Sequence, residues 1–293
     1  MAAKSSEIHD KLIKDALTHL SADEAAPATS ADERGRKAIE KLCRRTDAAT
    51  LDAAIALSKS ADNARKRLGA DILGRLGMSS ADLAGVFREE RFQALRELIE
   101  TEMTAAADTG VLGAVCSAFS QLEDPRAVPL VLPLIGHSSV DLRMFVALVL
   151  SDHEDEAAIA GLIRLSADPH ETVRDCATGG LALIDADSAA IRAALHARLT
   201  DSSAEARGQA IHALVEREDR AVLPFLAQEL AGPRPHTFLE DALELADPSL
   251  CPALVQAGKT ISSTRGDREA ETRYWKNSWR EAMAACGCRS KEA

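Results

Sequence analysis

Apolar residues recur at helical spacing along most of the chain, and their order repeats about every 32 residues. Val173-Arg174 with Ala177 returns one unit later as Ala206-Arg207 with a further alanine. The same point in three successive units is marked by Ile159, Ile191 and Val222. No alternating apolar and polar pattern of the kind that strands show competes with this period. Two amphipathic helices per period predict an all-α fold, a stacked α-solenoid.

The pattern divides each unit into a first-type helix, a polar turn and a second-type helix. We predict pairs at 50–59 with 62–76, 81–103 with 108–122, 125–135 with 140–151, 156–166 with 171–184, 188–199 with 204–217, and 219–231 with 236–246. A helix over 5–20, a half repeat over 35–45 and a last first-type helix over 248–258 complete the expectation. Prolines 129, 133 and 224 fall inside first-type helices and should bend them.

Composition shifts suggest three domains: an N-terminal helix and linker at 1–34, the repeats at 35–258, and a C-terminal helix with a tail at 259–293. The tail helix holds Tyr274, Trp275 and Trp279, in a chain with only nine aromatic residues. Trp275 and Trp279 share one helical face with Ala282 and Cys286. We favour a cap that covers the last repeat, as solenoids require. An aromatic anchor for a partner is the alternative.

Charge is distributed unevenly along the 293 residues, which carry a net charge of −11. Residues 1–258 hold 27 Lys and Arg against 41 Asp and Glu, whereas residues 259–293 hold 8 against 5. Phosphate binding needs clustered Lys and Arg, so an acidic body argues against a nucleic acid as the main ligand. No secretory signal and no membrane-spanning run is visible, and we expect a cytoplasmic location.

The six cysteines and the acidic clusters do not predict metal chemistry. The cysteines are scattered, which fits reduced thiols in the cytosol, and Cys286-Gly287-Cys288 lacks a second pair or a nearby His for zinc. The run from His153 to Glu156 resembles a metal cluster, but Asp155 belongs to a series of acids at helix starts. A capping role is therefore favoured there. We expect no metal and no cofactor.

The repeat unit resembles the HEAT repeat, including the HEAT-like repeats of phycobilin lyases. The resemblance rests on AVPLV at 127–131, on Leu142-Arg143, and on the units that contain Arg174 and Arg207. It covers about residues 35–258 and implies a HEAT-like superhelix of about six helix pairs. In HEAT repeats a turn Asp and an Arg six residues later form a ladder. Asp168 with Arg174, and Asp201 with Arg207, match that spacing, so we expect Arg174 to bridge Asp168 and Asp201. His137 replaces the Asp before Arg143.

Solenoids bind partners along extended concave surfaces, which the second-type helices should line here. A ridge at i, i+3 and i+7 on each of these helices faces away from the core, and acids recur near the helix starts. The predicted partner-binding residues are Asp141, Phe145, Leu148, Glu171, Asp175, Cys176, Gly179, Glu205, Gln209 and His212. Because this surface is acidic, we expect a basic protein partner.

A narrower similarity covers residues 140–254. This run is similar to a group of bacterial HEAT-repeat proteins, some of them encoded beside Rhs-type toxins and regarded as immunity proteins. The similarity rests on the segment VRDCATGGLALIDADSAAIRAAL, in which Cys176 and Gly179 replace the usual Trp and Phe. The resemblance implies a protein-binding solenoid without catalysis that neutralises a cognate toxin. The alternatives are a HEAT-like enzyme, of the bilin lyase or alkylpurine DNA glycosylase type, and a general assembly scaffold.

Overall fold

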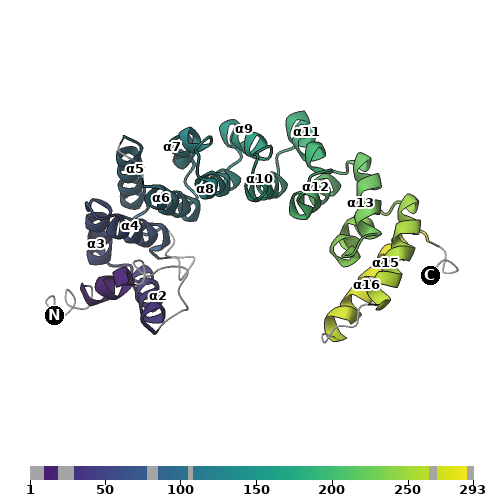
Figure 1. The fold of residues 1–293 in the computed structure, drawn as a ribbon, viewed down its shortest axis with the longest axis horizontal. Helices are drawn as coiled ribbons and strands as arrows, with labels where there is room; N and C mark the ends of the chain where they lie inside the picture. Colours follow the sequence, from purple (N-terminus) through teal and green to yellow (C-terminus); the bar gives the residue numbers. More distant parts are fainter. Residues whose placement is uncertain (1–9, 19–29, 78–84, 105–107, 264–268, 289–293) are drawn as a thin grey trace. The chain divides into compact units, whose positions relative to one another are not determined.

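A computed structural model of the chain describes residues 10–18, 30–77, 85–104, 108–263 and 269–288. Within these ranges the regular structure is entirely helical, and the predicted all-α solenoid is confirmed. The chain divides into two compact units, residues 1–161 and residues 162–293. In each unit, first-type helices pack beside second-type helices, and the second-type helices lie side by side (Figure 1).

The first unit begins with a helix over residues 10–18. Its further helices are α2 (Ser30–Cys43), α3 (Ala48–Ser58), α4 (Asn63–Arg75), α5 (Arg88–Thr104), α6 (Thr109–Leu122), α7 (Val128–Val131) and α8 (Val140–Ser151). The second-type helices α4, α6 and α8 form one row, and the first-type helices α3, α5 and α7 pack along one side of that row (Figure 1). Helix α9 (Glu156–Leu165) starts in this unit.

Close helix contact and a buried cation hold the α4–α6 layer of this unit. A Cβ at Gly74 would lie 2.7 Å from the Cα of Ala118, so only glycine allows this approach. Arg91 is 1% exposed and donates to the carbonyls of Leu73 and Gly74, which lie in the last turn of α4. These carbonyls have no partner within their own helix, and the guanidinium satisfies them. Burial lowers the pKa of Arg91 to about 10.

The second unit contains α10 (Glu171–Leu183), α11 (Ala189–Arg198), α12 (Ala204–Glu216), α13 (Leu223–Leu230), α14 (Leu239–Leu245), α15 (Cys251–Ser263) and α16 (Glu269–Ala285). Helix α10 packs against α12, and α12 packs against α14. Apolar side chains from both helix types fill the layers between them, among them Val173, Leu195, Ile211 and Leu226, all 1% exposed or less.

The predicted helix pairs are all present, with differences at boundaries that reflect local chemistry. The first-type helix at 125–135 is broken into η2 (Pro125–Ala127), α7 and η3 (Leu132–Leu134), because prolines interrupt its hydrogen bonds. Helix α5 begins at Arg88 rather than at 81, directly after Phe87 in a left-handed conformation. Helix α2 begins inside the predicted linker, and α15 runs five residues past the predicted end at 258. The predicted starts at 5 and 81 lie outside the described residues.

Four aspartates of the series at helix starts, to which Asp155 belongs, cap those helices, and a fifth does not. The carboxylates of Asp124, Asp155, Asp219 and Asp247 each accept a main-chain N–H two residues ahead. Asp187 is the exception: Ser188 caps α11, and Asp187 pairs with Arg192 at 2.6 Å. The structure thus assigns Asp155 to capping, as the series of acids indicated.

The C-terminal helix α16 packs on α14 and α15. The indole N–H of Trp279 donates to the carbonyl of Leu254 at 2.7 Å. A Cβ at Gly258 would lie 2.6 Å from the Trp279 ring, so the indole lies flat on the α15 backbone. Ala282 and Cys286 are buried on the same face. This arrangement is that of a cap on the last repeat.

The cysteines differ from the expectation that all are reduced. Cys251 of α15 and Cys288, just after α16, form a disulfide. Cys43, Cys116, Cys176 and Cys286 are free thiols. Spacing alone did not indicate the bond, because the two residues are 37 positions apart and meet only when α16 folds back. Since such bonds persist in oxidising surroundings, the structure stands against a fully reduced protein.

Replacing Trp279 with alanine should destabilise the second unit. The change removes the indole that packs on the α15 backbone and its hydrogen bond to Leu254, at a cost of about 3 kcal/mol. Tyr274→Ala on the same helix is the control, because Tyr274 is 58% exposed. Urea unfolding followed by circular dichroism measures both variants. Equal midpoints for Trp279→Ala and the wild type would contradict the capping role.

Candidate protein-binding surface

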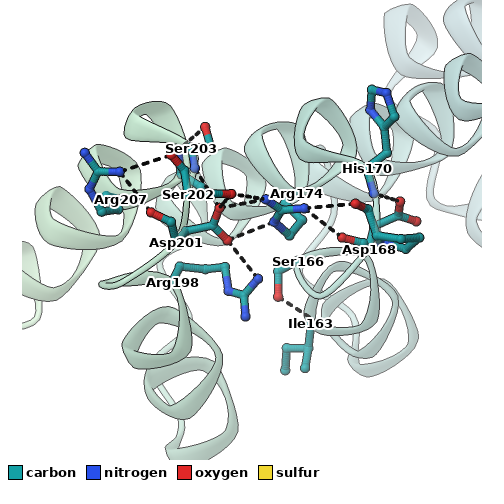
Figure 2. A network of polar contacts seen from close by, with 12 residues as sticks. Ile163, Ser166, Asp168, His170, Arg174, Arg198, Asp201, Ser202, Ser203 and Arg207 are labelled. Atoms are coloured by element: carbon teal, nitrogen blue, oxygen red, sulfur yellow. Dashed lines mark hydrogen bonds and ion pairs between the residues drawn. The ribbon is translucent and has the colours of Figure 1, made fainter.

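The second unit is held together along its turns by a network of polar contacts around Arg174 (Figure 2). The Nε and Nη2 groups of Arg174 donate to the two carboxylate oxygens of Asp201 at 2.8 and 2.7 Å. Its Nη1 group donates to the main-chain carbonyl of Asp168 at 3.1 Å. The pair is largely buried, with side-chain exposures of 12% and 4%. A single guanidinium thus ties α10 both to the turn before it and to the turn of the next repeat.

The predicted bridge between two turn aspartates needs one correction. Arg174 meets Asp201 through its carboxylate, but it meets Asp168 through the backbone. The Asp168 carboxylate accepts instead from the main-chain N–H of His170 at 2.9 Å, where it shapes the turn (Figure 2). This difference arises because two nitrogens of the guanidinium, Nε and Nη2, already face Asp201. The third nitrogen, Nη1, points towards the carbonyls of Asp168 and Pro169 in the preceding turn.

The Asp201 carboxylate accepts several hydrogen bonds in this network. Besides Arg174, it accepts from Arg198 at 3.0 Å and from the N–H of Ser203 at 2.9 Å. The hydrogen bond from Arg174 is the main cause that lowers the pKa of Asp201 to about 2. Burial acts in the opposite direction but is outweighed. Asp201 is therefore ionised throughout the physiological range, which keeps the pair intact.

The corresponding arginines of the neighbouring repeats also donate to a main-chain carbonyl six residues earlier, as Arg174 does to Asp168. Arg207 donates to the carbonyl of Asp201 at 2.9 Å, and in the first unit Arg143 donates to the carbonyl of His137 at 2.8 Å. The replacement of Asp by His137 therefore leaves this contact in place. The carboxylate partner of Arg207 is Glu229 of α13, at 2.8 Å, which the expected turn-to-turn ladder did not include.

A second series of ion pairs in this unit was not predicted. Arg192 pairs with Asp219 at 3.3 Å, and Arg220 pairs with Asp247 at 2.6 Å. Each pair spans 27 residues, the same separation as Arg174 and Asp201. The signal that could have revealed it is this Arg-to-Asp spacing, slightly shorter than one repeat. Each of these pairs ties one repeat to the aspartate at the start of the next, as Arg174 and Asp201 tie theirs.

The predicted binding residues of the second unit lie on adjacent faces of α10 and α12. Glu171 and Glu205 are exposed, whereas Asp175, Cys176 and Gln209 are half-buried. A Cβ at Gly179 would lie 3.9 Å from the side-chain carbonyl carbon of Gln209, which shows that the two helices meet there. Gln209 also donates to Glu205 at 3.0 Å. The structure therefore brings these residues onto one polar face.

His212 is engaged by neighbours that the sequence did not reveal. Its Nδ1 lies 2.8 Å from a carboxylate oxygen of Asp241, and its ring stacks on Phe238 with centroids 5.5 Å apart. The hydrogen bond that His212 donates to the Asp241 carboxylate raises the pKa of His212. Both partners come from the η5 (Pro235–Phe238) and α14 segment, so His212 joins α12 to the next repeat. It also lines a small hollow of about 180 Å³.

The predicted binding residues of the first unit, Asp141, Phe145 and Leu148, lie on α8. Asp141 and Phe145 line a groove of about 490 Å³ between α4, α6 and α8. The Phe145 ring lies 3.1 Å from where a Cβ of Gly113 would be, so glycine makes room for it. Leu148 is 40% exposed. Arg67 also lines this groove, which therefore carries both charges.

Parts of the chain are similar in sequence to known repeat proteins. Residues 96–182 match the family of HEAT repeats. A segment of 117 residues, 40% of this chain, is 34% identical to protein YibA of Escherichia coli strain K12. The chain spans 42% of the length of that relative, and YibA of Escherichia coli O157:H7 matches equally.

The fold is shared with a relative of known structure. The X-ray structure of YibA superposes with a TM-score of 0.64 at 23% identity, over 94% of this chain and 97% of that chain. The complex of CpcE and CpcF of phycocyanin lyase from Nostoc sp. PCC7120 has a TM-score of 0.46 at 17% identity, over 88% of this chain and 99% of that chain. The chain is thus a repeat solenoid with HEAT repeats over residues 96–182, similar in fold to YibA.

In the described part of the chain, no helix is both long enough and apolar enough to cross a bilayer. Nowhere in the same residues do three His, Cys, Asp or Glu side chains gather closely enough to hold a metal ion.

Replacing Arg174 with alanine should lower the free energy of unfolding by about 3 kcal/mol, because Asp201 is left buried without its main cation. Arg44→Ala serves as the control. Arg44 forms an exposed pair with Glu40, with side-chain exposures of 64% and 45%, and such pairs contribute about 0.5 kcal/mol. Urea titrations give both values. A loss for Arg174→Ala no larger than that for Arg44→Ala would remove the ladder as a source of stability.

The same network predicts how stability depends on pH. The pKa of Asp201 is about 2 in the folded chain, below its value of about 3.9 when unfolded. The unfolded chain therefore binds the proton first, and this contribution is full above about pH 4 and is lost as the pH falls towards 2. Asp201→Asn should be less stable at pH 7 and should lose less stability on acidification. Urea midpoints from pH 7 to pH 2.5 test this, and parallel curves would contradict it.

Proposed function

We propose that the chain is a non-catalytic scaffold that binds a basic partner protein on the second-type helices of its second unit, as an immunity protein neutralising a cognate toxin. The supporting observation is the charge left on these helices once internal pairs are taken into account. The acids of α10, α12 and α14 are Glu171, Asp175, Glu205, Glu216, Glu240, Asp241 and Glu244.

The cations of the same helices are committed to internal contacts. Arg174 is bound to Asp201, and Arg207 is bound to Glu229 and to a turn carbonyl. Arg217, which follows α12, donates to the carbonyl of Ile184 at 2.8 Å. Of the seven acids, Asp241 faces His212, while Glu171, Glu216 and Glu244 have no ion pair with a described residue. The helices therefore present a surplus of negative charge.

Such a surface favours a cationic protein for two reasons. Its field steers a partner of opposite charge and raises the association rate, and it disfavours nucleic acids and acidic proteins. Toxins that cleave nucleic acids bind phosphate through clustered Lys and Arg. An acidic scaffold is complementary to that surface and can cover it, which would neutralise the toxin without any chemical step.

The partner can be identified by placing a photo-crosslinking amino acid at Gln209 and irradiating cells that express the chain. The captured protein is then purified and its association measured by stopped flow. We expect a basic protein whose association slows as salt rises past about 0.15 M, where the screening length falls below about 8 Å. Asp175→Lys with Glu205→Lys should slow association about tenfold and change dissociation less.

The matched control is Asp52→Lys with Glu156→Lys, which makes the same charge change at exposed sites of α3 and α9, both first-type helices. These variants should slow association much less, because their charges lie off the proposed surface. Association that is independent of salt, equal effects of the two double variants, or capture of an acidic protein would refute the proposed function.

A further inference from the structure

In the second unit, the large apolar side chains that are exposed lie on α10, α14 and α16. Among its described residues, Leu183 is 79% exposed, Tyr274 58% and Leu243 38%. They lie on α10, α16 and α14, while α11, α13 and α15 expose none of comparable size. Scattered exposed leucines are ordinary, but apolar groups gathered on one face mark an interaction surface.

Side-to-side contacts join these helices into one surface. Gly179 of α10 meets Gln209 of α12, and His212 of α12 bonds to Asp241 of α14 at 2.8 Å. The hydroxyl of Tyr274 on α16 donates to Glu240 of α14 at 2.9 Å. The four helices α10, α12, α14 and α16 thus follow one another without a break, and the exposed apolar groups occupy three of them.

Carboxylates accompany the apolar groups along this surface. Glu216 near the end of α12 and Glu244 of α14 are exposed and have no ion pair with a described residue. Glu244 directly follows Leu243, and Glu216 lies on the ridge of α12 that corresponds to the ridge of Leu183 on α10. An occupant must therefore present aliphatic side chains and cations together, since either kind alone would leave the other surface unmatched.

We infer that this surface binds an amphipathic, lysine- or arginine-rich helix of the partner, with its apolar face on Leu183 and Leu243. This inference rests on the proposed function and specifies the element that the basic partner contributes. An amphipathic helix places apolar residues in one stripe with cations on either side, which matches the arrangement here. An extended segment instead turns alternate side chains away from the surface.

The size of the surface sets the length of the occupant. Packed neighbouring helices lie about 8–10 Å apart, so α10 and α14, two steps apart, are separated by roughly 20 Å. A helix rises about 1.5 Å per residue, so it needs about 13 residues to cover that distance. A helix of four to five turns would extend from Leu183 past Leu243 towards Tyr274.

The test compares two 18-residue peptides of identical composition. In the first, leucines recur at i, i+3, i+4 and i+7 among lysines and serines; in the second, the same residues are rearranged so that the leucines share no face. We expect the first peptide to bind the full chain about tenfold more tightly and to gain helix on binding. Leu183→Asn with Leu243→Asn should abolish this preference.

Met103→Asn is the control variant, because Met103 is 39% exposed and lies on α5 of the first unit. It should keep the preference, and thermal melts should show all variants folded, since the altered side chains are exposed. Equal binding of both peptides, or an unchanged preference in the double leucine variant, would overturn the helix inference and leave the basic partner standing. Binding of neither peptide would overturn both.

Discussion

The buried contact between Arg174 and Asp201 is the interaction on which the second unit most depends. A stack of helix pairs ends every helix in a turn, and each turn leaves main-chain carbonyls without partners. In water these groups would be solvated, but between two packed repeats they need a donor. The guanidinium supplies several donors in one plane, so Arg174 can satisfy the turn behind it and a carboxylate ahead of it. Lysine has its donors on one nitrogen and cannot present this planar fork.

This use of arginine has a consequence for the surface. Each arginine that binds a turn has its charge engaged inside the protein, so it adds little positive charge to the surface that a partner contacts. Most acids of the same helices are not engaged in this way. The second-type helices of the second unit therefore present a more acidic surface to a partner than their composition suggests. The structural role of Arg174 and Arg207 and the proposed preference for a basic partner are two results of one arrangement.

Much of the fold could be predicted from the sequence because the period is read directly from apolar spacing. Every helix pair was predicted, and most boundaries agree to within a few residues. The features that were not predicted depend on contacts between residues that lie far apart in the sequence. The disulfide between Cys251 and Cys288 requires α16 to fold back on α15, and no local pattern indicates that. The partner of His212 was missed for a similar reason, because Asp241 lies in a short helix whose register is set by proline and by the stacking of Phe238.

The C-terminal helix shows how the end of the stack is linked to the proposed surface. The last repeat needs a cover, and α16 provides it by laying Trp279 on the bare backbone at Gly258. Once that face of α16 is fixed, Tyr274 is held on the side of α14, where its hydroxyl reaches Glu240. Trp275 stacks on His236 with ring centroids 4.2 Å apart, which fixes the helix further. The tryptophans thus hold the helix as a cap, and the exposed ring of Tyr274 lies beside α14, next to the proposed surface.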